Sequence, residues 1–151
     1  MKNMNMRVRS GERGSALIEA ALTLPLLLLV SVGIFEFGRV FQTWQVLTNA
    51  AREGARIAVL PGAASGDVQA RVRQYLQDGQ LGGYSSATIN VDRAATIAVG
   101  AGTASASVVT VNYPYDFMVL NPVARLVVSN SSLGTPITIS VAAEMRNESP
   151  F

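Results

Sequence analysis

Residues 16–35 form an apolar run of 20 residues that contains a single charged side chain, Glu19. As an α-helix rising about 1.5 Å per residue, this run is roughly 30 Å long, the thickness of the hydrocarbon core of a bilayer. A carboxylate inside such a segment is costly to insert and by default indicates a function. We therefore expect a membrane-inserted helix whose one acid has a specific role.

The positive charge of the chain is concentrated before this run. The first 14 residues carry four basic side chains and one acidic side chain, whereas the rest of the chain carries eight basic and nine acidic ones. The net charge of +2 therefore comes from the leader, and we do not interpret it as a nucleic-acid-binding surface. Under the positive-inside rule the leader should stay in the cytoplasm, with the C-terminal part facing outward.

The composition argues against enzymatic chemistry. The chain has no cysteine and no histidine, so it lacks disulfides, thiolate metal sites and the commonest general base and metal ligand. Its only lysine, Lys2, lies in the leader. Four aspartates follow the helical region without metal-ligand spacing, and turn or cap roles suit them: Asp67, Asp78, Asp92 and Asp116. We expect no enzyme activity, no cofactor and no metal site.

Three kinds of N-terminal signal combine a basic leader with an apolar run. A cleaved secretory signal usually has a shorter apolar region followed closely by a small-x-small cleavage site, and no good site of that kind follows here. An uncleaved signal anchor explains the span but leaves Glu19 without a role. A signal cut on the cytoplasmic side, between Gly14 and Ser15, explains the leader, the small residue and the acid together, and we prefer it.

Gly14-x-x-x-x-Glu19 resembles the prepilin-peptidase site of type IV pilins and pseudopilins. Residues 13–58 as a whole resemble the TadE-like minor pilins of the tight-adherence (Tad/Flp) pilus, most clearly at Glu36-Phe37-Gly38-Arg39 and at residues 47–56. The major Flp pilins usually have tyrosine after the glutamate, where this chain has Ala20, and they are much shorter. Both differences favour a minor subunit.

The resemblance implies a structural role in pilus assembly, supporting adhesion or secretion. It implies cleavage by a prepilin peptidase, and it implies other Tad pilins, an inner-membrane platform and the lipid bilayer as partners. The subunit would cross the inner membrane once, with its C-terminal domain periplasmic, and could also enter the extracellular pilus. The alternative is an unprocessed, signal-anchored extracytoplasmic binding module.

The resemblance also assigns a role to Glu19. Cleavage would free the amine of Ser15, one helical turn away, and a nearby cation lowers the cost of a carboxylate in a bilayer. Glu19 would then meet its own amine or that of an adjacent subunit and set the register of assembly. On geometry alone, a glutamate that simply reaches the cytoplasmic interface explains its position equally well.

The helix should continue beyond the membrane to Leu60-Pro61-Gly62. Glu36 with Arg39, and Glu53 with Arg56, have the spacing of i,i+3 ion pairs on a polar face. One apolar stripe is predicted from residues three and four apart: Phe37, Val40, Phe41, Trp44, Leu47, Ala51, Ala55 and Ala58. The small residues Ala50, Gly54 and Ala58 permit close helix packing, either between subunits or on the chain's own domain.

The C-terminal part predicts an α+β domain. Asp67 is expected to cap a helix at 68–77, residues 100–102 form a hairpin loop, and residues 121–128 are ambiguous, with a short helix as one option. Period-two patterns predict strands at 88–91, 95–99, 105–113 and 137–145. The predicted fold is pilin-like: a long N-terminal transmembrane and stalk helix packed on a small antiparallel sheet with one extra helix. The expected segments are a leader at 1–14, a transmembrane helix at 15–36, its stalk continuation at 37–60 and an extracytoplasmic domain at 61–151.

Overall fold

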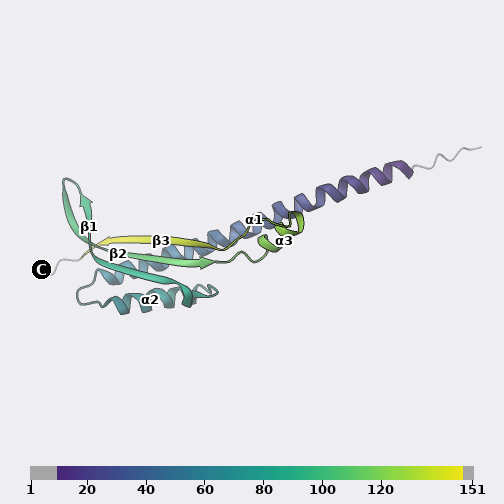
Figure 1. Ribbon diagram of the computed structural model, residues 1–151. Helices are drawn as coiled ribbons and strands as arrows, with labels where there is room; N and C mark the ends of the chain where they lie inside the picture. Colours follow the sequence, from purple (N-terminus) through teal and green to yellow (C-terminus); the bar gives the residue numbers. More distant parts are fainter. Residues whose placement is uncertain (1–9, 148–151) are drawn as a thin grey trace, which may run out of the picture.

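The computed structural model describes residues 10–147. It consists of one long helix and a small domain that packs on one end of this helix (Figure 1). The described elements in chain order are α1 (Ser10–Ala58), α2 (Ser65–Asp78), the 3₁₀ turn η1 (Tyr84–Ser86), β1 (Thr88–Val99), β2 (Gly102–Tyr115), α3 (Leu120–Val127) and β3 (Ile137–Arg146). The layout is the predicted α+β fold, with α3 as a third helix in the region that the sequence left ambiguous.

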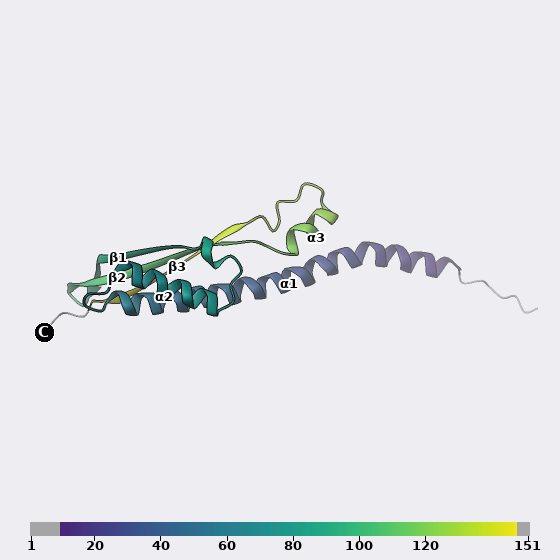
Figure 2. The same cartoon turned by 90° about the horizontal axis from the view of Figure 1, so that it is seen from below.

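Helix α1 runs without interruption for 49 residues and passes through Pro25. Among the described residues, it is the one helix that is long and apolar enough to cross a membrane. Its most apolar 18-residue window has a mean hydropathy of 2.3, and none of that window is buried. The N-terminal half therefore projects away from the domain, while the C-terminal half is covered by it (Figures 1 and 2).

The three strands form an antiparallel sheet in the order β1-β2-β3. The prediction of two separate strands at 88–91 and 95–99 was wrong, because β1 is continuous and absorbs a bulge between Asp92 and Ala95. The Asp92 carboxylate accepts a hydrogen bond from the Ala94 N–H at 2.9 Å, which supports the bulged backbone. A bulge of this kind lets a strand continue past residues that do not fit the ladder.

Strand β2 is central and extends beyond its predicted ends. Its pairing with β1 stops at Asn112, whereas its pairing with β3 continues to Tyr115. Pro114, next to the end of the strand, therefore lies where β2 has only one neighbour, which is where a residue without an N–H is tolerated.

Helix α2 begins at Ser65, three residues before the predicted start. Asp67 is therefore not the N-cap residue: it lies in the first turn, and its carboxylate accepts a hydrogen bond from the Ala64 N–H at 3.3 Å. The same side chain still satisfies an amide at the helix start, but from inside the helix.

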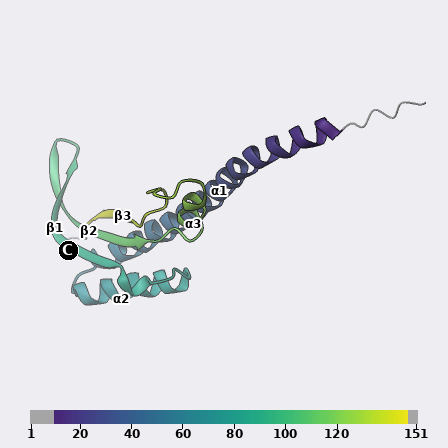
Figure 3. The ribbon, with the colours of Figure 1, turned by 45° about the vertical axis from the view of Figure 1, so that its right-hand side comes forward.

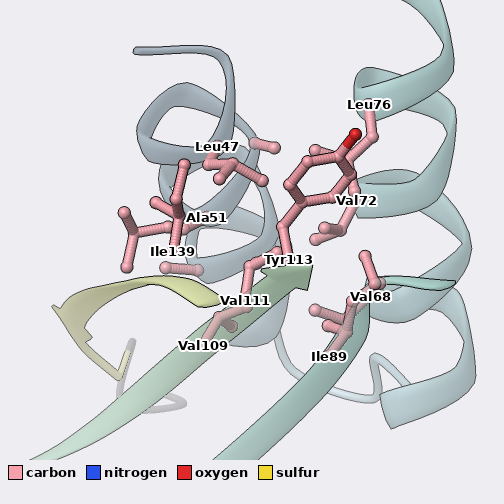
Figure 4. Close-up of a cluster of buried hydrophobic side chains, with 14 of the residues drawn as sticks. Leu47, Ala51, Val68, Val72, Leu76, Ile89, Val109, Val111, Tyr113 and Ile139 are labelled. Atoms are coloured by element: carbon pink, nitrogen blue, oxygen red, sulfur yellow. The ribbon is translucent and has the colours of Figure 1, made fainter. Parts of the chain in front are cut away.

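Helices α1 and α2 lie side by side on one face of the sheet, α1 against β2 and β3, and α2 against β1 (Figures 3 and 4). The core between these layers is mainly aliphatic, with two aromatic rings, Tyr113 and Tyr115, near its end. Its main side chains are Leu47 and Ala51 from α1, Val68, Val72 and Leu76 from α2, and Ile89, Val109, Val111, Tyr113 and Ile139 from the sheet.

The predicted apolar stripe of α1 is correct only in its C-terminal half. Phe37, Phe41 and Trp44 are 70%, 49% and 46% exposed, and the last two stack with ring centroids 6.0 Å apart. The face that packs on the domain is instead continued toward the N-terminus by Thr43 and Glu36, both buried. The large side chains at the C-terminal end of the apolar run therefore point away from the domain.

Candidate functional site

The predicted processing motif lies at the start of α1 on an uncovered surface. Gly14, Ser15 and Glu19 are all exposed and helical. Ser15 and Glu19 are four residues apart, so the structure places them on the same face of the helix. Among the described residues, and apart from its chain neighbours and the adjoining helix backbone, no heavy atom lies within 4 Å of the position that a Cβ would take at Gly14. The fold itself therefore gives no steric reason for glycine here.

The surface that follows the motif is almost entirely apolar. Large exposed side chains run along α1 from Leu17 to Phe35, and most are more than half exposed. Large apolar surfaces without a partner mark membrane or protein interaction sites. This half of α1 therefore needs either lipid or other subunits around it.

Glu36, just after the C-terminal end of the apolar run, is the functional candidate that sequence reasoning placed wrongly. Its ion pair with Arg39 is present, at 3.0 Å, but Glu36 does not lie on a polar face: it is 1% exposed. Its Oε2 also accepts a hydrogen bond from the Tyr115 hydroxyl at 3.2 Å, and its Oε1 accepts one from the Val119 N–H at 2.6 Å. The carboxylate thus joins α1 to the end of β2 and to the residue before α3.

The surroundings of Glu36 suit a charged carboxylate. Three donors converge on it, and the Arg39 guanidinium also lies 5.6 Å from the centre of the Tyr115 ring. Burial raises the pKa of the Tyr115 hydroxyl, Arg39 opposes this shift, and Glu36 adds to it. The tyrosine therefore remains a neutral donor at neutral pH. A sequence signal existed, because Glu36 precedes Val40, Thr43 and Leu47 at the spacing of the buried face.

The second predicted ion pair is replaced by a different one. Glu53 binds Arg71 of α2 at 3.1 Å rather than Arg56 of its own helix, and Arg71 also donates to Gln74. The Glu53 and Arg71 side chains are 26% and 41% exposed. This pair joins the two helices at the surface of the domain, in contrast to the buried Glu36.

The small-residue row of α1 faces the chain's own core. Ala50, Gly54 and Ala58 are all buried. A Cβ at Gly54 would lie 2.5 Å from Cγ2 of Val72 and 3.2 Å from Cγ1 of Val109. Of the two packing options that the sequence left open, the structure thus shows these residues packed within the chain.

A polar cleft of about 560 Å³ lies between α1, the loop after α2 and the end of β2. Its lining includes Arg39, Asp78, Tyr113 and Asp116. No group of three or more potential metal-ligating side chains occurs anywhere in residues 10–147. Within the described part of the chain, the cleft thus offers no set of side chains suited to hold a metal ion.

Comparison with known protein families gives a match over the helix that carries Glu19 and Glu36. No curated protein and no solved structure matches the chain. A family model described as TadE-like protein matches residues 14–56, a segment that begins at the predicted cleavage site and includes both Glu19 and Glu36. The match confirms the resemblance seen in the sequence: the N-terminal helix of the chain is similar to TadE-like proteins over these residues.

Proposed function

We propose that the protein is a minor pilin that is cut after Gly14, held in the inner membrane by α1 and taken into the Tad pilus, or used to prime it, for adhesion or secretion. The family match supports association with this pilus. One observation carries the proposal: a single helix has the processing motif and an uncovered apolar half at one end, and forms part of the domain core at the other.

The continuity of α1 gives this arrangement a mechanical consequence. No break separates the apolar half from the half that carries Leu47, Ala51 and Ala55 in the core. Since both halves belong to one helix, withdrawal of the apolar half from the membrane moves the domain with it. A signal anchor joined to its domain by a flexible linker would not transmit such a movement.

The proposed partners follow from the surface of α1. A prepilin peptidase would recognise Gly14 and Glu19 on the cytoplasmic side, and the bilayer would cover the apolar half until other Tad pilins and the inner-membrane platform replace it. The protein acts as a structural subunit rather than an enzyme, and it binds no nucleic acid. The alternative remains an unprocessed, signal-anchored binding module.

Cleavage is tested by measuring the N-terminal mass of the protein expressed with and without its prepilin peptidase. We expect a mature N-terminus at Ser15 only when the peptidase is present, and we expect Gly14→Val to keep the leader. Gly38→Val is the matched control, because neither glycine has a heavy atom within 4 Å of its Cβ position. An intact leader in both strains would refute the processing and favour the unprocessed module.

Glu19→Ala separates processing from assembly. We expect the variant to be cut but to enter the pilus about tenfold less often, since a tenfold change needs only about 1.4 kcal/mol and an uncompensated amine in a bilayer costs more. The amount of the subunit in sheared pili, relative to the membrane fraction, measures this effect. Glu53→Ala serves as the control, because Glu53 lies on the same helix but in the half that belongs to the domain. Normal incorporation of Glu19→Ala would contradict the role of Glu19.

A further inference from the structure

The connection between β2 and β3 leaves the sheet and lies beside the apolar half of α1. In Figures 1 and 2, α3 lies along α1, away from the sheet and from α2. Between the two helices is an apolar groove of about 810 Å³. Five residues of α1 between Ala21 and Leu28 line one side, and Val123 and Leu126 line the other.

The position of this groove can be measured along α1. Glu36 binds the Val119 N–H at the end of the apolar run, and so holds the start of α3 at the outer end of the span. Leu28 lies eight residues nearer the N-terminus and Ala21 fifteen, which is roughly 12 Å and 22 Å along the helix. The groove therefore begins level with the outer half of the proposed membrane-spanning segment and extends to its middle.

The composition of this connection matches that position. Arg125 is the only charged residue between Asp116 and Glu144. Asn121 and Arg125 are four residues apart and share one face of α3. The exposed apolar side chains are Met118, Leu126, Val128, Leu133 and Ile137, of which Leu126 is 81% exposed. They continue the uncovered apolar surface of α1.

The irregular backbone after α3 makes several of its hydrogen bonds within the segment. The Asn121 amide donates to the Leu133 carbonyl at 3.1 Å, and the Leu133 N–H donates to the Ser131 hydroxyl at 3.2 Å. The Ser131 N–H donates to the Val128 carbonyl at 2.9 Å. Gly134, with a φ of +75°, packs so closely that a Cβ would lie 2.6 Å from the Asn121 nitrogen. Irregular backbone of this kind is not tolerated in the hydrocarbon core, so this part of the connection belongs at the membrane interface rather than within the bilayer.

We propose that α3 inserts into the outer leaflet of the membrane beside α1, with lipid acyl chains in the groove next to Leu126 and a lipid phosphate near Arg125. This inference rests on the proposed membrane anchoring by α1. Lipid is the occupant that the observations favour, because the groove is continuous with the surface of α1 that the bilayer covers. A lone cation in an otherwise uncharged segment also suits an anionic headgroup.

The absence of cysteine from the sequence makes a direct test possible, because any introduced cysteine is unique. Leu126→Cys is labelled with a fluorophore in the full chain, in vesicles of phosphatidylcholine and phosphatidylglycerol. Quenching by spin-labelled lipid is compared with quenching by aqueous iodide. Leu22→Cys is the control in the span, and Thr103→Cys is the control at the exposed start of β2. We expect the label at 126, like the label at 22, to be quenched by spin-labelled lipid and not by iodide.

The possible results distinguish this inference from the proposed anchoring. Quenching at 126 by iodide, with quenching at 22 by lipid, would overturn the inference and leave the anchoring intact. Quenching at 22 by iodide would overturn the anchoring as well. Protection at 126 from both quenchers would indicate a second copy in the groove and overturn the choice of lipid. Arg125→Glu should lower the lipid quenching at 126 several-fold, whereas Arg146→Glu should not, and equal effects would contradict a phosphate near Arg125.

Discussion

Glu36→Ala is expected to lower the free energy of unfolding of the domain by about 3 kcal/mol. The substitution leaves the Tyr115 hydroxyl and the Val119 N–H without their acceptor and leaves Arg39 without its counter-ion. Hydrogen bonds to a charged group contribute about 1.5–3 kcal/mol each, and a buried group that loses its partner costs more than an exposed one. Chemical denaturation of the full chain in detergent, followed by the tyrosine signal of the domain, measures the change.

The matched control is Glu53→Ala, which removes the same kind of side chain from the same helix. Glu53 and Arg71 are partly exposed, so we expect this variant to lose less than about 1 kcal/mol. Hydrogen exchange at the Val119 amide gives a second readout, because Glu36→Ala should accelerate it and Glu53→Ala should not. Equal losses of stability in the two variants would show that the buried carboxylate is not a structural clamp.

The parts of the fold that the sequence predicted well are those with long, uniform patterns. The 20-residue apolar run and its continuation predicted α1, and period-two alternation predicted β2 and β3 to within three residues at each end. These patterns are reliable because each depends on the burial of one whole face of an element, which no single residue can change.

The prediction was wrong for charged residues whose partners lie far away in the sequence. Asp92 and Arg93 lie in the gap between the two predicted strands, but a bulge accommodates them and the Arg93 side chain donates to carbonyls of Leu60 and Ala63. Arg93 reaches residues 30 or more positions away, which no local pattern reveals. The same limitation applies to Glu53, whose partner Arg71 lies on another helix.

Glu36 shows why the candidate site was predicted only in part. The predicted processing motif is a local signal, since Gly14, Ser15 and Glu19 lie within two turns of one helix. Glu36 acquires its role from Tyr115, which is 79 residues away in the sequence. A charged residue at a core position of the helix is the one local indication of such a partner, because a buried carboxylate must find donors elsewhere in the fold.

Gly54→Val is expected to lower the free energy of unfolding by about 3 kcal/mol, or the melting temperature of the domain by about 15 °C. The added Cβ would overlap Val72 and press on Val109, and both side chains lie in a core that has no exposed surface into which they could move. Gly38→Val should change stability by less than about 0.5 kcal/mol, because nothing lies within 4 Å of that position. Val72→Ala should recover part of the loss in a Gly54→Ala background, since it removes the atom that the new Cβ meets. If instead Gly54→Val unfolds like Gly38→Val but is lost from the pilus, the row of small residues contacts a neighbouring subunit and not α2.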